Sequence, residues 1–400
     1  MIDNLGAEGQ MTILHRRRAA KSAFAVPQRD AADGCLSNLS NSAGTLTRRS
    51  LLAAGAGLAL APGTVAPARA ERHGAPRSGP VPLGCAVQAE YFDADPAYRD
   101  AAVEYFDLIM PMNELKFDQI RPTRDSWNFE PADRLVEFAL SHGRSTRGTC
   151  HVWWNSTPQW VEEIETAADA EAALIEHIER VGDRYKAKLT GWDVVNEVIS
   201  HNPISEGPLR RTAWLKKLGP QHIPIAFEAT ARADPGARLV INDYDLEFAG
   251  PRYDARREVM LTIVRQLQDR NVAVTGVGIQ GHLYADRTID KDALEVFHRT
   301  LDGLGVGLLV TELDVIDWES VPGAEPQDAT AQRLVTDLLD GVFAFKAPES
   351  VIVWGVSDRY SWVSDVLPRP DGHPSRPLPL DRDMAPKRWM TLLRQRLRSI

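Results

Sequence analysis

Two glutamates in this sequence each lie near the end of a short apolar run that contains β-branched residues. Glu197 follows the run 191–196, and Glu312 lies in the run 307–315. Runs of this kind are typical of buried parallel strands, which deliver their last side chains to the open end of a barrel. Two carboxyl groups that meet across one site are what acid-assisted cleavage of a glycosidic bond requires. Taken singly, either glutamate is equally well explained as a solvated residue at a strand end.

The elements that must position these glutamates alternate regularly from residue 82 onward. Eight segments rich in Val, Ile and Leu are predicted to be strands, at 83–88, 107–112, 146–153, 191–196, 238–242, 275–280, 307–312 and 350–356. Amphipathic stretches are predicted to be helices, at 131–142, 169–187, 221–233, 254–270, 290–304, 328–346 and 385–397. This alternation predicts an α/β fold, a (β/α)8 TIM barrel that forms a single catalytic domain over residues 82–400.

Functional side chains of such a barrel lie at the carboxyl ends of its strands. Amide, ammonium, carboxylate, imidazole, phenol and indole groups follow seven of the predicted strands at that end: Asn113, Lys116, Trp153, Asn196, Tyr244, Gln280, His282, Asp314, Trp354 and Trp362, together with the two glutamates. Each has an ordinary structural explanation when taken alone, such as capping a turn or packing in the core. Their coincidence at one end of the barrel indicates a functional site.

The composition and charge of the chain exclude some classes of binding partner. With 44% hydrophobic and 25% charged residues, the chain resembles a soluble globular protein. A formal net charge of −9 argues against binding to nucleic acid or to an anionic membrane surface. Cys35, Cys85 and Cys150 show no metal-ligand spacing, so we expect no metal and no cofactor, and whether Cys85 pairs with Cys150 stays open. We expect a monomer that binds a polysaccharide or oligosaccharide.

The first 81 residues differ from the rest of the chain. Residues 1–46 are polar and basic without a periodic pattern, and we interpret them as a disordered or non-native extension. Arg48 and Arg49, an apolar run too short to span a bilayer, and the ending Ala68-Arg69-Ala70 predict a twin-arginine type signal peptide over 47–70. Residues 71–81 are predicted to be a linker. We therefore expect a secreted or periplasmic protein with no membrane span in the mature chain.

Several motifs, taken in this order, resemble glycoside hydrolase family 10, the retaining endo-xylanases. The clearest are residues 192–197 (WDVVNE), 278–282 (GIQGH), 311–314 (TELD) and 353–358 (VWGVSD). Residues 242–244 (NDY), Asn113 with Lys116, and 380–387 (LDRDMAPK) agree in order and spacing. The resemblance covers nearly all of 82–400.

The resemblance implies a role for each matching residue. Glu197 would be the acid/base and Glu312 the nucleophile, with Asn196 binding the 2-hydroxyl of the reacting sugar. His282 would contact Glu312 and be oriented by Asp314. The remaining residues would contact the substrate: Gln280, Asn113 and Lys116 at glycone hydroxyls, Trp153, Trp354 and Trp362 as an aromatic platform, and Tyr244 near the aglycone.

Four positions depart from the family pattern. Met112 stands where the family usually has a glutamate, while Thr149, Trp154 and Ser156 replace two histidines and a glutamine. The groups that would hydrogen-bond the glycone are therefore altered while the catalytic pair is kept. We expect weak activity on plain xylan.

Three functions stay open. The first is a secreted retaining β-glycosidase that hydrolyses internal β-1,4 linkages of xylan, or of a related or decorated polysaccharide, by double displacement. The second is a glycosidase or transglycosylase acting on a bacterial exopolysaccharide. The third is a non-catalytic carbohydrate-binding barrel. A binding protein needs no pair of mutually tuned carboxylates, so the presence of Glu197 and Glu312 favours an enzyme.

Overall fold

The computed structural model describes residues 80–398 and contains one sheet of parallel strands. Along the sheet the order is β2-β1-β9-β8-β6-β5-β4-β3. Each predicted strand segment overlaps one of these strands, and only β5 and β8 run beyond the predicted end: β1 (Leu83–Val87), β2 (Leu108–Pro111), β3 (Val152–Trp153), β4 (Gly191–Asn196), β5 (Arg238–Asp243), β6 (Gly276–Ile279), β8 (Gly307–Ile316) and β9 (Val351–Val353). A further strand, β7 (His282–Tyr284), pairs with β8 beyond the end of β6.

The segment that leads into β3 closes the sheet. Ser145 forms a parallel bridge with Leu108 of β2, and Gly148 forms one with Trp192 of β4. The Trp192 ring fills the space beside Gly148, where a Cβ atom would lie 2.2 Å from a ring carbon. Within the predicted strand 146–153, only Val152 and Trp153 form regular strand. The closed order of eight parallel strands is a (β/α)8 TIM barrel, which confirms the predicted fold class.

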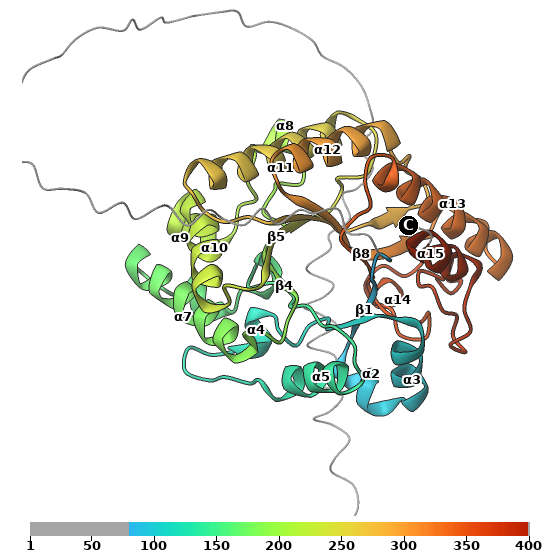
Figure 1. The fold of residues 1–400 in the computed structure, drawn as a ribbon, viewed down its shortest axis with the longest axis horizontal. Coiled ribbons are helices and arrows are strands. Elements are labelled where there is room, and N and C mark those ends of the chain that lie inside the picture. The colour runs from blue at the N-terminus through green and yellow to red at the C-terminus, as the bar shows by residue number, and fades with distance from the viewer. Residues whose placement is uncertain (1–79, 399–400) are drawn as a thin grey trace, which may run out of the picture. The chain divides into compact units, whose positions relative to one another are not determined.

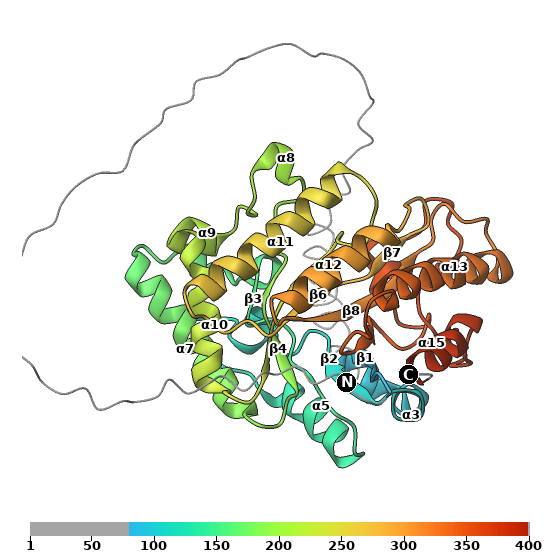
Figure 2. The same cartoon turned by 45° about the horizontal axis from the view of Figure 1, so that its top comes forward.

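Helices surround the strands (Figure 1). The seven predicted helices are present with small changes at their ends: α5 (Glu130–Ser141), α7 (Ala167–Tyr185), α10 (His222–Ala233), α11 (Pro251–Asp269), α12 (Lys291–Gly303), α13 (Ala324–Phe343) and α15 (Arg388–Arg398). Figure 2 shows α11 and α12 side by side. The sequence analysis missed α3 (Pro96–Tyr105), which joins β1 to β2.

Short helices in the connections were missed as well, because four to six residues carry too little periodicity to be recognised. They are α2 (Ala89–Ala94), α4 (Phe117–Ile120), α6 (Gln159–Glu162), α8 (Pro203–Glu206), α9 (Ala213–Leu218) and α14 (Trp362–Val366), with the 3₁₀ turns η1 (Trp154–Ser156) and η2 (Gly219–Gln221). Two of them, η1 and α14, carry tryptophans of the site described below.

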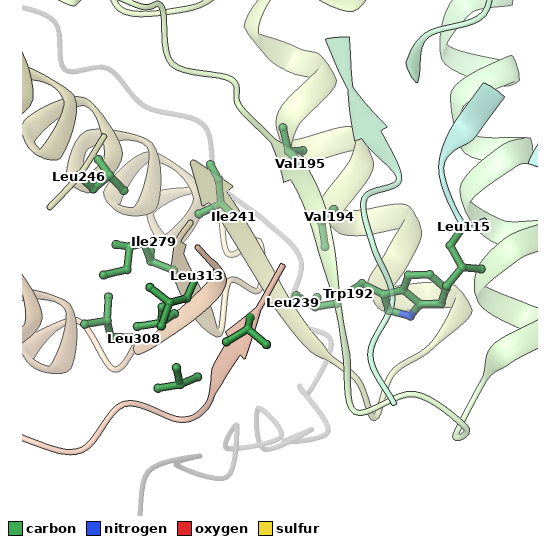
Figure 3. Close-up of a cluster of buried hydrophobic side chains, with 14 of the residues drawn as sticks. Leu115, Trp192, Val194, Val195, Leu239, Ile241, Leu246, Ile279, Leu308 and Leu313 are labelled. Carbon is green, nitrogen blue, oxygen red and sulfur yellow. The ribbon is translucent and has the colours of Figure 1, made fainter. Parts of the chain in front are cut away.

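The core is built from the strands and the helix faces that cover them. Figure 3 shows part of it, including Trp192 and Val194 on β4, Ile241 on β5 and Leu308 on β8, all fully buried. Two histidines belong to this packing. His151 stacks on Trp192 at 4.3 Å and His177 stacks on Phe117 at 3.6 Å between ring centroids. Burial lowers the pKa of His151 to about 3, so it is a neutral core residue at ordinary pH.

The predicted extension 1–46, the signal peptide 47–70 and residues 71–79 of the linker lie outside the described residues. Within 80–398, no helix is both long and apolar enough to cross a membrane. Cys85 and Cys150 are buried free thiols, so the structure does not join them.

Candidate active site

Glu197 directly follows β4 in an unusual backbone conformation. Its φ angle is 54°, in the left-handed region that residues with a side chain rarely adopt. The conformation is held from both sides, because the Glu197 N–H donates to the Asn242 carbonyl at 2.9 Å and the Glu197 carbonyl accepts from Arg210 Nε at 2.9 Å. Such a residue persists only where its surroundings hold it, and it is often found at a functional site. Its carboxylate accepts bonds from Gln280 and from Trp154.

Glu312 lies within β8 and is also buried. Asn242 Nδ2 donates to Glu312 Oε1 at 2.7 Å and to Asn196 Oδ1 at 3.0 Å. The Thr311 hydroxyl donates to Asn242 Oδ1 at 2.6 Å, which fixes the orientation of this amide. The sequence analysis placed Asn242 in a family motif without giving it a role, and the structure shows that it links the ends of β4, β5 and β8.

His282 lies between the carboxylates of Glu312 and Asp314. His282 Nδ1 lies 2.8 Å from Asp314 Oδ1, and His282 Nε2 lies 3.4 Å from Glu312 Oε2. Burial alone would lower the pKa of His282, but Asp314 and Glu312 outweigh burial and raise that pKa well above its usual value. Burial raises the pKa of Glu312, His282 opposes this rise, and Glu197 adds to it.

Trp362, expected in the aromatic platform, also supports this charged group. Its indole Nε1 donates to Asp314 Oδ2 at 2.6 Å, and its ring centroid is 5.1 Å from that of His282. Asp314 is fully buried and accepts from both rings. The carboxylate therefore sets the orientation of an imidazole and an indole at the same time.

Gln280 contacts both Asn196 and Glu197 at the end of β4. Its Nε2 group lies 3.2 Å from Asn196 Oδ1 and 3.3 Å from Glu197 Oε1. Asn196 Oδ1 thus accepts from both Gln280 and Asn242, which leaves the Asn196 amide N–H groups to donate to a ligand. We expected Gln280 to contact a sugar hydroxyl, and the structure also places it against the Glu197 carboxylate.

Four of the predicted substrate residues form a second cluster near the ends of β2, β3 and β9. Lys116 Nζ donates to Asn113 Oδ1 at 2.8 Å. The same ammonium lies 4.5 Å from the ring centroid of Trp153 and 5.7 Å from that of Trp354. Asn113 Nδ2 in turn donates to Gln88 Oε1 at 3.1 Å, a partner that the sequence analysis did not identify.

Tyr244 directly follows β5 and shares a partner, Arg210, with Glu197. Its hydroxyl accepts from Arg210, and the guanidinium of Arg256 lies 4.2 Å from its ring centroid. Arg210 is a second residue that the sequence analysis missed, because it lies in a loop between α8 and α9 with no local pattern. Among residues 80–398 there is no group of three or more His, Cys, Asp or Glu side chains that would hold a metal ion.

The family model for glycosyl hydrolase family 10 matches residues 72–395, more than half of the chain. The protein belongs to this family. It is 34% identical to a beta-1,4-xylanase of Dictyoglomus thermophilum over 73% of this chain and 82% of that protein. It is 32% identical to exoglucanase XynX of Acetivibrio thermocellus over 71% of this chain, which spans only 26% of that longer protein.

Among solved structures, the chain is similar to xylanase 10B from Thermotoga petrophila in complex with xylobiose. The TM-score is 0.69 at 29% identity, over 79% of this chain and 94% of that chain. These comparisons confirm the family resemblance. The individual roles of the site residues remain predictions that follow from it.

Where the chain departs from the family 10 pattern, the structure shows what the replacing residues do. Met112, Thr149 and Ser156 are each at most 4% exposed. Met112 packs in an apolar cluster that includes Trp354. Trp154 is different, because its indole Nε1 donates to Glu197 Oε2 at 2.7 Å. Trp154 therefore supplies a hydrogen bond to the predicted acid/base as well as an aromatic ring.

Proposed function

We propose that this family 10 protein is a retaining β-glycosidase that hydrolyses internal β-1,4 linkages of a xylan-type polysaccharide. The observation that carries the proposal is the linked pair of buried glutamates. Glu312 is held by Asn242 and His282, and Glu197 is held by Gln280 and Trp154. A pair with such different surroundings suits two different roles in one reaction.

In the first step, Glu312 attacks the anomeric carbon while Glu197 gives its proton to the glycosidic oxygen that leaves. His282 opposes the rise that burial causes in the pKa of Glu312, and this favours the ionised form that a nucleophile needs. In the second step, Glu197 takes a proton from water, and the hydroxide attacks the same carbon and releases Glu312. Asn196 is placed to donate to the sugar 2-hydroxyl during both steps.

The relatives support the choice of substrate class. One is named as a beta-1,4-xylanase, and one solved xylanase was crystallised with xylobiose. Another relative is named as an exoglucanase, and this chain spans 26% of its length, so the names of the relatives do not agree on one substrate.

Hydrolysis of linear xylotetraose, followed by proton NMR, tests both substrate and mechanism. We expect the first-formed reducing end to be the β-anomer, because two displacements restore the original configuration. Initial appearance of the α-anomer would contradict the double displacement. No reducing ends from any β-1,4-xylan would contradict the substrate class.

A second candidate substrate is a decorated or different β-linked glycan, including a bacterial exopolysaccharide. It is favoured by the burial of Met112, Thr149 and Ser156, which offer the cleft fewer hydrogen-bonding groups than the family pattern. On a panel of linear xylan, substituted xylans and other β-glycans, the linear chain should then give a kcat/KM roughly 10- to 100-fold below the best substrate. Equal or faster hydrolysis of linear xylan would exclude this candidate.

We also propose that the protein is exported to the periplasm or the medium. The support is Arg48 and Arg49, followed by a short apolar run and the ending Ala68-Arg69-Ala70. Replacing both arginines by lysine should leave the full-length precursor in the cytoplasm. Export of that variant at the normal rate would contradict a twin-arginine signal.

A further inference from the structure

Trp154 is brought to the acid/base by the register of two strands. β3 pairs with β4 so that Trp153 lies opposite Asn196. Trp154 and Glu197 are the residues that follow this pair. Both therefore lie just beyond the carboxyl ends of their strands, at the same height along the barrel. Trp154 begins the turn η1, which aims its ring at the Glu197 carboxylate, and the bond from Nε1 to Oε2 is 2.7 Å long.

Arg210 contacts both residues of this hydrogen bond, Trp154 and Glu197. The Arg210 guanidinium lies 5.0 Å from the Trp154 ring centroid, and Arg210 Nε donates to the Glu197 carbonyl at 2.9 Å. The same guanidinium donates to the Tyr244 hydroxyl and is held there. Stacking of a cation on an indole is favourable, so the ring is held in one orientation relative to the Glu197 backbone. The geometry of the bond is thus set before a substrate arrives.

An indole N–H differs chemically from a histidine N–H. It donates, never accepts, and does not titrate. A hydrogen bond to a carboxylate is also stronger than one to a neutral carboxyl group. The bond to Oε2 therefore strengthens as Glu197 loses its proton. Among the residues that the structure describes, the other oxygen, Oε1, has only the longer contact of 3.3 Å with Gln280, and it is the atom available to carry the proton.

We propose that Trp154 is a positioning residue for Glu197, an inference that rests on the proposed glycosidase function. The Trp154 N–H donates to Oε2, so the acidic proton of Glu197 is carried on Oε1. From Oε1 it passes to the glycosidic oxygen. As the bond from the anomeric carbon to that oxygen breaks, its electron pair stays with the oxygen and accepts this proton. The carboxylate left behind is stabilised by the indole N–H. The residue that departs from the family pattern thus serves proton transfer rather than sugar binding.

A spectroscopic experiment on the full chain tests the contact without a substrate. In protein labelled with ¹⁵N-tryptophan, Trp154→Phe identifies the Trp154 indole N–H resonance by its loss. We expect this resonance to shift with pH in the wild type, because its acceptor ionises, and to stop doing so in Glu197→Gln. A Trp154 resonance that does not respond to pH, or that responds equally in Glu197→Gln, would overturn the proposal.

A kinetic experiment tests the consequence. Trp154→Phe keeps an aromatic ring but removes the donor, and it should lower kcat/KM roughly 10- to 100-fold on substrates whose leaving group needs a proton. The loss of kcat/KM should be much smaller on a 2,4-dinitrophenyl glycoside, whose leaving group needs none. The alkaline limb of the pH profile on the proton-requiring substrate should also move. Trp154→His, which restores a ring N–H, should lose less than Trp154→Phe.

Trp214→Phe is the matched control, because Trp214 is a buried tryptophan whose N–H has no hydrogen-bond partner within residues 80–398. A loss in Trp154→Phe that is the same for both leaving groups, or no larger than in Trp214→Phe, would overturn the positioning role. Failure of the proposed function would look different from failure of this inference. If the proposed function is wrong, the wild type cleaves no β-glycoside, although the Trp154 indole N–H resonance still shifts with pH.

Discussion

Glu312→Gln is expected to lower kcat by at least about 10⁴-fold on every glycoside, whatever its leaving group, because no other group can form the bond to the anomeric carbon. Glu197→Gln should behave differently. A 2,4-dinitrophenyl glycoside needs no protonation to leave, so the first step proceeds in this variant. The second step stalls, because no base activates water. Stopped-flow absorbance should therefore show a burst of about one dinitrophenolate per enzyme, followed by slow turnover.

Glu247→Gln supplies the matched control for these two variants. Glu247 is fully buried, and burial together with Asp245 raises its pKa to about 7. No hydrogen bond within residues 80–398 joins Glu247 to Glu197 or Glu312, and the site residue that acts on its charge is His282, so the change to an amide removes a buried carboxyl without removing a direct partner of either glutamate. Normal turnover in this variant would show that burying an amide in place of a carboxyl is not itself inactivating. Absence of a burst in Glu197→Gln would refute the assignment of Glu197 as the acid/base.

Asp314→Asn is expected to lower kcat/KM near neutral pH by about 10- to 100-fold and to move the acid limb of the profile to higher pH. Burial lowers the pKa of His282, and Asp314 is the largest of the groups that raise it. Without that carboxylate, His282 loses its proton at a lower pH. Glu312 then loses the cation that opposes burial, so its pKa rises further and a larger fraction is protonated and unreactive. The size corresponds to one charge-assisted hydrogen bond, about 1.5–3 kcal/mol.

The control for this variant is Asp234→Asn. Asp234 is buried like Asp314 and also accepts from an indole, with Trp192 Nε1 at 3.2 Å. It contacts neither His282 nor the glutamates. Its change to asparagine should affect stability while leaving the pH profile of activity in place. An Asp314→Asn enzyme with an unshifted acid limb would show that His282 does not control the ionisation of Glu312.

The pattern of apolar runs was enough to predict the fold class and the end of the barrel at which the site lies. Strands buried on both faces must be continuous apolar runs, so each predicted strand segment overlaps a strand of the barrel. Parallel strands of a barrel also place their carboxyl ends together, and residues as distant as Glu197, His282 and Glu312 were therefore expected to meet. Their individual roles came from the family resemblance, because strand position alone does not distinguish an acid from a nucleophile.

Only the tertiary structure decided which side chains on that rim touch one another. Asn242 reaches Glu312 over 70 residues and Gln280 reaches Glu197 over 83, distances at which local pattern carries no information. The contact of Trp154 with Glu197 depends on the register of β3 against β4, which differs by one residue from the register of the Gly148–Trp192 bridge earlier in the same segment. Arg210 reaches the site from an irregular loop. Register and loop path are set by the packing of the whole barrel, so the sequence pattern predicts the strand ends but not the bonds between them.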